Sequence, residues 1–216
     1  MERHPAFEEY CECIFELHED DLDVIQARIA ERLEVSRASV SQMIDKLTKA
    51  GLVETVDNHV QLTGEGTNLA TTVVRRHRLA ERFLTDVLGL SWAEAHHEAG
   101  KWEHVMSDSV ETAMNRLLGA PTTCPHGNPI PGSSYVDPDT RPLGTLSAGT
   151  EFTVSRIPEE LEFTPGLLEF LESSSIQPGR RGHVSSVDRD GSMEVDVEGR
   201  RISVDAFASA RILVTA

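Results

Sequence analysis

Histidine and glutamate side chains are concentrated in one short stretch, HHEAGKWEHVMSD at residues 96–108. Three histidines and two glutamates lie there within nine residues, with Gly100 between them. On a helix, which turns roughly 100° per residue, five of these positions share one face while Trp102 and Met106 share another. One stripe is therefore expected to pack and the other to present nitrogen and oxygen ligands. The second stripe is made up of His96, His97, Gly100, Glu103 and His104.

Two further groups of the same chemical type precede this stretch. His77 and Glu81 are spaced i, i+4, which places them on one helical face. Glu9 and Glu12 lie on one face of a predicted N-terminal helix. One such pair is usually a solvated pair, but the three groups together indicate a metal site. Imidazole and carboxylate suit Mn, Fe, Co, Ni or Zn, and the absence of thiolate from this set disfavours a soft structural site.

Composition narrows the class of protein. The chain has 216 residues, enough for one large domain or two to three small ones. It lacks an apolar run near the ~18–20 residues of a membrane span and a signal sequence, so we expect a soluble cytoplasmic protein without a membrane partner. Cys11, Cys13 and Cys124 do not form a disulfide framework or a paired zinc motif. The net charge of −16 by itself argues against binding to nucleic acid. DNA binding, however, needs only a local basic face, and the surplus carboxylates could instead bind cations.

The first 64 residues predict a winged helix-turn-helix domain. Apolar periodicity predicts helices over 7–17 and 24–34. The stretch 35–52 predicts a short break and a third helix closed by Gly51. Residues 52–63 alternate apolar and polar around Asp57-Asn58, which is typical of a hairpin.

The remainder predicts a mainly α protein with a small β domain at its end. Helices are expected over 65–90 and 92–118, within a helical metal-binding and dimerisation domain at residues 65–120. Residues 121–145 are rich in Pro, Gly and Ser and are predicted to be a linker. Residues 146–216 contain five short strand patterns, a GLLEFLE helix and an Asp190-Gly191 turn, which together indicate an SH3-like barrel.

Several of these stretches resemble the metal-dependent repressors of the diphtheria toxin repressor family, which includes iron-dependent and manganese-dependent regulators. The similarity covers residues 7 to about 132, and the C-terminal barrel agrees only in outline. The segments that carry it are RIAERLE at 28–34, SVSQ at 39–42, RRHRLAERFLTDVLGL at 75–90, HHEAGKWEHVMSD at 96–108 and GNPIPG at 127–132. The resemblance implies a homodimer that binds operator DNA and two metal ions per subunit.

The resemblance also implies two sets of metal ligands. One set resembles Glu9, Glu103 and His104 together with residue 100. The other resembles His77, Glu81 and His96, completed by side chains of the third domain. Candidates there are Glu159, Glu160, Glu162, Glu169 and Glu172, although a solvated acidic face is expected for most of them.

This chain departs from both branches of the family at the first set. Iron-type members have methionine where Glu9 stands and cysteine where Gly100 stands. Manganese-type members have acidic residues at the positions of Glu9 and Glu12 and a glutamate at the position of Gly100. The ligand missing at 100 must be replaced by water, by a backbone carbonyl or by Glu12. Alternatively, Gly100 serves only to let two helices pack closely.

The start of the third helix predicts the DNA contact, since the first residues of a recognition helix reach the base edges. Gln42 matches the glutamine that the family places on a base, and the Ala38 methyl group suits a thymine methyl. The DNA-contacting set is expected to be Ser36, Arg37, Ala38, Ser39 and Gln42, with Arg28, Arg37, Lys46 and Lys49 on phosphates. Two-fold dimers read paired half-sites, so we expect a palindromic operator. The apolar candidates for the dimer interface are Leu84, Val87, Leu88, Leu90 and Trp92.

These observations predict a metal-activated repressor that controls divalent metal homeostasis and is not an enzyme. Loss of the soft ligands favours Mn²⁺, with an Fe²⁺-dependent regulator as the alternative. A metal-independent winged-helix regulator that senses an organic ligand is a second alternative. A dinuclear hydrolase is disfavoured, because the sequence shows no catalytic base or phosphate cradle.

Overall fold

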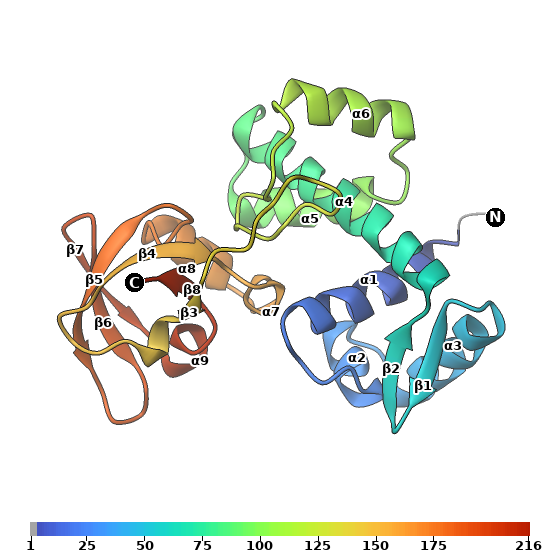
Figure 1. The fold of residues 1–216 in the computed structure, drawn as a ribbon, viewed down its shortest axis with the longest axis horizontal. Helices are drawn as coiled ribbons and strands as arrows, with labels where there is room; N and C mark the ends of the chain where they lie inside the picture. Colours follow the sequence, from blue (N-terminus) through green and yellow to red (C-terminus); the bar gives the residue numbers. More distant parts are fainter. Residues whose placement is uncertain (1–3) are drawn as a thin grey trace.

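The computed structural model describes residues 4–216 and arranges them in three lobes that follow the order of the chain (Figure 1). The first lobe is the predicted winged helix-turn-helix. Its elements are α1 (Pro5–Glu19), α2 (Gln26–Arg32), α3 (Arg37–Lys49), β1 (Val53–Val56) and β2 (His59–Leu62).

Local sequence explains where α3 and the wing begin and end. Ser36 caps α3 by accepting a hydrogen bond from the backbone N–H of Ser39 at 3.1 Å. Gly51 follows the helix with φ +75°, a conformation that glycine adopts without strain. Asp57 and Asn58 both have positive φ, 48° and 66°, as a two-residue hairpin turn requires. The predicted helix end and hairpin are therefore confirmed.

The second lobe consists of α4 (Gly64–Asp86), α5 (Trp92–Trp102) and α6 (Asp108–Leu117). The prediction of one helix over 92–118 is wrong, because the chain turns at 103–107. Ser107 caps α6 by accepting from the N–H of Val110, and Asp108 in its first turn pairs with Arg76. These contacts favour a new helix start over continuation. Within residues 4–216, no helix is both long and apolar enough to cross a membrane.

The first half of the predicted linker, residues 121–145, is folded against the second lobe. Cys124, His126, Asn128 and Ile130 are all buried. Arg75 donates a hydrogen bond to the carbonyl oxygen of Pro131 at 2.9 Å, and Arg78 donates to that of Pro129 at 2.5 Å. Residues 124–131 are therefore packed on α4 as part of the second lobe. Proline and glycine here shape a folded loop.

The third lobe is a six-stranded antiparallel sheet with the order β3-β8-β4-β5-β6-β7. The five strand patterns, the GLLEFLE helix and the turn at Asp190-Gly191 occur as predicted, with Gly191 at φ +91°. Its elements are β3 (Arg141–Pro142), η1 (Leu143–Thr145), β4 (Glu151–Arg156), α7 (Glu159–Glu162), α8 (Leu167–Ser173), β5 (Arg181–Val187), β6 (Met193–Val197), β7 (Arg200–Val204), α9 (Ala206–Ser209) and β8 (Leu213–Thr215).

Two residues predicted at the dimer interface are buried within the chain itself. The side chain of Trp92 belongs to the apolar core of the third lobe, and its backbone N–H donates to the carboxylate of Glu172 at 3.0 Å. Leu84 is buried in the core of the second lobe. Both are therefore unavailable to a second subunit. Val87 and Leu88 are 50% and 53% exposed, so both remain accessible to a second subunit.

The contact between the wing and α4 generates a stability prediction. A Cβ atom on Gly66 would lie 2.0 Å from the carbonyl oxygen of Leu52, a backbone atom that cannot move independently. Gly66→Ala should therefore lower the free energy of unfolding by about 1–3 kcal/mol, measured by urea denaturation. The matched control is Gly64→Ala, whose Cβ would meet nothing within 4 Å. Equal stability of the two variants would contradict this packing.

Candidate metal centre

His77 on α4 joins the two predicted ligand sets into one cluster. Its Nδ1 lies 2.5 Å from Oε2 of Glu103. Its Nε2 lies 3.2 Å from Oε1 of Glu81 and 3.3 Å from Nδ1 of His96. The two sets are therefore in direct contact through one imidazole ring.

The second set gathers at the junction of α4, α5 and α7. Ligand atoms of His77, Glu81 and His96 lie within 4.8 Å of one another. Glu162 of the third lobe places Oε2 3.2 Å from Nδ1 of His96, and Glu159 belongs to the same group. These two glutamates are the third-domain residues that meet the predicted set.

The other acidic candidates of the third lobe lie elsewhere. Glu160 pairs with Arg211 at 2.5 Å, Glu172 accepts from the N–H of Trp92, and Glu169 is exposed. The expectation of a solvated acidic face holds for Glu169 and is wrong for the buried Glu159 and Glu162. Which face of a four-residue helix turns inward depends on the docking of the lobe, and no periodicity reveals it.

The first set surrounds a cavity of about 370 Å³ between α1 and α5. Glu9, Glu12, Gly100, Glu103 and His104 all line it. A carboxylate oxygen of Glu12 lies within 4.8 Å of ligand atoms of His77 and Glu103. The cavity thus brings together every residue that the sequence assigned to this set.

Gly100 is not needed for helix packing. A Cβ atom built on it would meet no heavy atom within 4 Å. Position 100 therefore borders open space in the cavity, which excludes the interpretation that glycine is there for close approach of two helices. A side chain added at this position would border the cavity that Glu12, Glu103 and His104 also line.

Glu8 is a residue of the site that the sequence analysis missed. It is 3% exposed, and its Oε2 lies 2.8 Å from Nδ1 of His104, whereas the predicted Glu9 is exposed at the rim of the cavity. Glu8, Glu12 and Glu16 are spaced i, i+4, i+8 and are all buried. That spacing was a signal that they share the inward face of α1.

The crowded charges shift the pKa values of several of these groups. Burial raises the pKa of Glu12 well above its ordinary value, and Glu103 and Glu16 raise it further. Burial lowers the pKa of His77, but Glu81 and Glu103 outweigh that effect and raise it. In the same way, Glu162 and Glu81 raise the pKa of His96 to about 10 against the effect of burial. Without metal, protons on these groups neutralise the buried carboxylates.

The donor atoms fit divalent cations. Within residues 4–216, Oε1 of Glu12 and the Oε2 atoms of Glu81 and Glu159 are buried and have no hydrogen-bond partner. Buried polar atoms are nearly always hydrogen-bonded, so unpartnered oxygens beside imidazole nitrogens indicate places where a cation completes the site.

The recognition helix presents a polar face to solvent. Ser36, at its cap, and Arg37, Ala38, Ser39, Gln42 and Lys46 are exposed. Arg28 lies on α2, and its Nη1 is 4.0 Å from Oε1 of Glu160 in the third lobe. Its contact with a phosphate stays a prediction.

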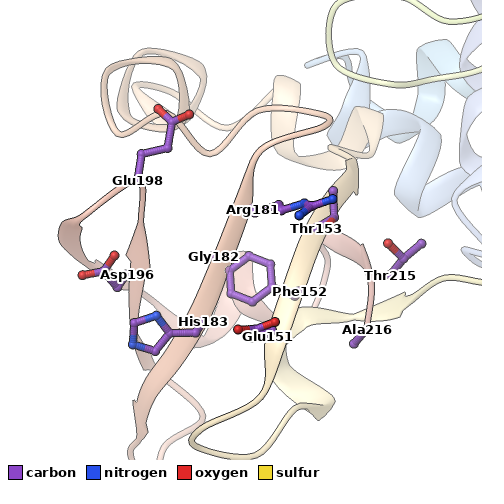
Figure 2. A pocket seen from close by; sticks show the side chains of 10 residues that line it. All are labelled: Glu151, Phe152, Thr153, Arg181, Gly182, His183, Asp196, Glu198, Thr215 and Ala216. Carbon is purple, nitrogen blue, oxygen red and sulfur yellow. The ribbon is translucent and has the colours of Figure 1, made fainter.

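A separate pocket of about 650 Å³ lies on the sheet of the third lobe (Figure 2). Phe152 lies there beside Gly182, where a Cβ would approach its ring to 2.7 Å. Figure 2 shows Glu151, His183 and Asp196 along neighbouring strands of its wall. The pocket shares no residue with the metal cluster, so it does not belong to that centre.

Comparison with known proteins identifies relatives along most of the chain. Residues 4–59 match the family model of the N-terminal DNA binding domain of iron dependent repressors, and residues 63–132 match that of their metal binding and dimerisation domain. The iron-dependent repressor IdeR of Mycobacterium tuberculosis is 38% identical over 196 residues, 85% of each chain. The diphtheria toxin repressor of Corynebacterium diphtheriae is 38% identical over 207 residues, 91% of each chain.

Solved structures superpose on nearly all of the chain. A structure described as a manganese-dependent transcriptional repressor in complex with manganese superposes with a TM-score of 0.87 at 33% identity, covering 97% of this chain and 99% of the other. A structure of ScaR with bound Zn²⁺ superposes with a TM-score of 0.79 at 28% identity, covering 97% and 98%.

Metal binding is expected to release protons and to become tighter as the pH rises. The pKa of His96 is about 10, so at neutral pH its ring carries a proton that must leave before the nitrogen can bind a cation. Each displaced proton should weaken the apparent affinity about tenfold for every unit by which the pH falls. Calorimetric Mn²⁺ titrations one pH unit apart, in buffers of different ionisation enthalpy, measure both effects. The control His96→Gln should release fewer protons, and an affinity independent of pH would contradict the assignment.

Proposed function

This chain belongs to the iron-dependent repressor family and is a metal-dependent transcriptional repressor, not an enzyme, and we propose that its activating ion is Mn²⁺. The observation that carries the proposal is the oxygen-rich cavity beside Gly100. Glu9, Glu12 and Glu103 line it with His104, and glycine supplies no thiolate. Cys13 also lines the cavity, but burial raises the pKa of its thiol, and the oxygen donors that remain suit Mn²⁺ better than sulfur does.

We propose two ions in each subunit. The first ion is held by Glu9, Glu12, Glu103 and His104, with water at the position that Gly100 leaves open. The second is held by His77, Glu81 and His96 together with Glu162. His77 contacts Glu103 of the first set at 2.5 Å, so occupation of one site orients a ligand of the other.

The ions act by connecting lobes. Glu8, Glu9 and Glu12 are on α1 of the DNA-binding lobe, whereas Glu103 and His104 are in the turn after α5. A cation between them favours the conformation in which α1 is fixed to the second lobe, which is a shift of population toward that state. In a homodimer this fixes the spacing of the two recognition helices for a palindromic operator.

The proposed repressor also needs a dimer interface and a DNA-binding surface. The half-exposed apolar residues of the second lobe form the dimer interface: Val87, Leu88, Val110 and Leu117. The polar face of α3 enters the major groove, where Gln42 and Ala38 contact bases and Arg37 and Lys46 contact phosphates.

Operator binding should require metal. Fluorescence anisotropy with chelator should show only weak binding, and Mn²⁺ should restore tight, sequence-specific binding. His77→Ala should weaken Mn²⁺ binding by about 10–100-fold and raise the Mn²⁺ needed for DNA binding. As a matched control, Gln42→Ala should bind Mn²⁺ normally and lose operator affinity. Equal DNA affinity with and without metal would refute metal activation.

Gly100→Cys tests the choice of metal. A thiol at position 100 has open space in the cavity, so the variant should fold and should shift activation from Mn²⁺ toward Fe²⁺. Anaerobic titrations of operator binding with each ion measure the selectivity, and Gly100→Ala controls for the added Cβ. Activation of the unmodified protein by Fe²⁺ at free concentrations well below those needed for Mn²⁺ would overturn the preference. Unchanged selectivity of Gly100→Cys would mean that this position does not face the ion.

A further inference from the structure

A pocket in the DNA-binding lobe, apart from the metal cluster, lies between α1 and β2 of the wing (Figure 1). Its cavity has a volume of about 540 Å³, and Ile14, Val24 and Val60 form part of an apolar wall. Two histidines and an aspartate also line it: His18, Asp23 and His59. These three residues do not belong to the ligand sets proposed above, and imidazole and carboxylate are groups that bind divalent cations.

The three polar residues come from three different segments. His18 is exposed in the last turn of α1, Asp23 lies between α1 and α2, and His59 is the first residue of β2. The backbone N–H of Val60 donates to the carbonyl oxygen of Val24 at 2.8 Å. This bond fixes the wing beside the segment that carries Asp23, so the backbone itself holds Asp23 and His59 next to each other.

Hydrogen bonding determines which nitrogen of His59 is free. Its Nδ1 lies 3.0 Å from the carbonyl oxygen of Asp57. A carbonyl oxygen can only accept, so Nδ1 carries the proton, and in the neutral ring Nε2 keeps a free lone pair. Histidines that bind a metal ion commonly donate their other N–H to such a carbonyl group, which fixes the orientation of the ring.

The free nitrogen of His59 faces a carboxylate oxygen. Its Nε2 lies 3.6 Å from Oδ1 of Asp23, which is longer than an ordinary hydrogen bond. Two ligands that each lie about 2.0–2.2 Å from one tetrahedral cation are roughly 3.3–3.6 Å apart. The pair therefore has the spacing of two ligands of one ion. The side chains of His59 and Asp23 are 46% and 75% exposed, so an ion can enter from solvent without any change in the core.

We propose that His18, Asp23 and His59 bind a divalent cation of borderline softness, with Zn²⁺ as the representative ion. Two imidazoles and one carboxylate leave the fourth tetrahedral position to water, as suits a site that opens to solvent. His18 completes the set by rotation of its exposed side chain within the pocket that it already lines. Imidazole suits Zn²⁺, whereas carboxylate and water suit Mn²⁺. The bound ion ties the C-terminal end of α1 to the wing, and it is distinct from the ions proposed for activation.

Zinc stoichiometry tests the site. By equilibrium dialysis at equal free Zn²⁺, wild-type protein should bind one ion more per subunit than His59→Gln or Asp23→Asn. The matched control is His183→Gln, which alters an exposed histidine of the third lobe and should bind as many ions as wild type. His18→Gln should weaken the additional ion by about 10–100-fold. Equal stoichiometry of wild type and His59→Gln, or an unchanged affinity of His18→Gln, would overturn the proposal.

Hydrogen exchange of the wing gives a second readout. Zn²⁺ should slow amide exchange over residues 53–62 in wild-type protein more than in His59→Gln, because the ion holds the hairpin on α1. His59→Gln should still bind Mn²⁺ as wild type does. His77→Ala separates this site from the proposed function, since it should impair manganese-dependent DNA binding and keep the zinc-dependent slowing in the wing. Equal slowing in wild type and His59→Gln would show that His59 and Asp23 form only an ion pair.

Discussion

The structure depends on how the negative charge of buried glutamates is neutralised. Within residues 4–216, seven glutamates are buried: Glu8, Glu12, Glu16, Glu81, Glu103, Glu159 and Glu162. A buried carboxylate is costly unless it is paired with a cation or holds a proton. These residues come from α1, α4, the turn after α5 and α7, so the cations that neutralise them also determine how the three lobes are joined.

Arg78 is the permanent cation of this junction. It is fully buried and donates to Glu19 of α1 at 2.5 Å, to Glu159 of α7 at 2.9 Å and to the carbonyl oxygen of Pro129. One guanidinium group, whose charge does not depend on metal, thus links all three lobes. The histidines are conditional cations, since they are charged only while they hold a proton. Metal ions can replace those protons between the same elements, and this makes the arrangement of the DNA-binding lobe responsive to metal.

Much of the site could be predicted because its ligands come in pairs with helical spacing. The i, i+4 spacing of His77 and Glu81 on α4 was enough to place both on one helical face. Glu103 and His104 were recognised from the similarity of the surrounding sequence to the family. At the N-terminus the sequence analysis named Glu9 and Glu12 and missed Glu8, although the inward stripe of the helix includes Glu8, which contacts His104. A rotation by one residue cannot be read from similarity alone, because consecutive glutamates look alike until the helix is docked.

The sequence by itself determined the local elements and the chemical class of the centre. The helix end at Gly51, the turn at Asp57-Asn58 and the strands of the third lobe depend on neighbouring residues, and local geometry was enough to predict them. Only the tertiary structure decided that Glu159 and Glu162 face His96, that the side chain of Trp92 packs in the core of the third lobe, and that the loop with Cys124 and His126 packs beside Glu81. These contacts join residues far apart in the chain. Their geometry depends on how whole lobes dock, and no short-range pattern in the sequence records that.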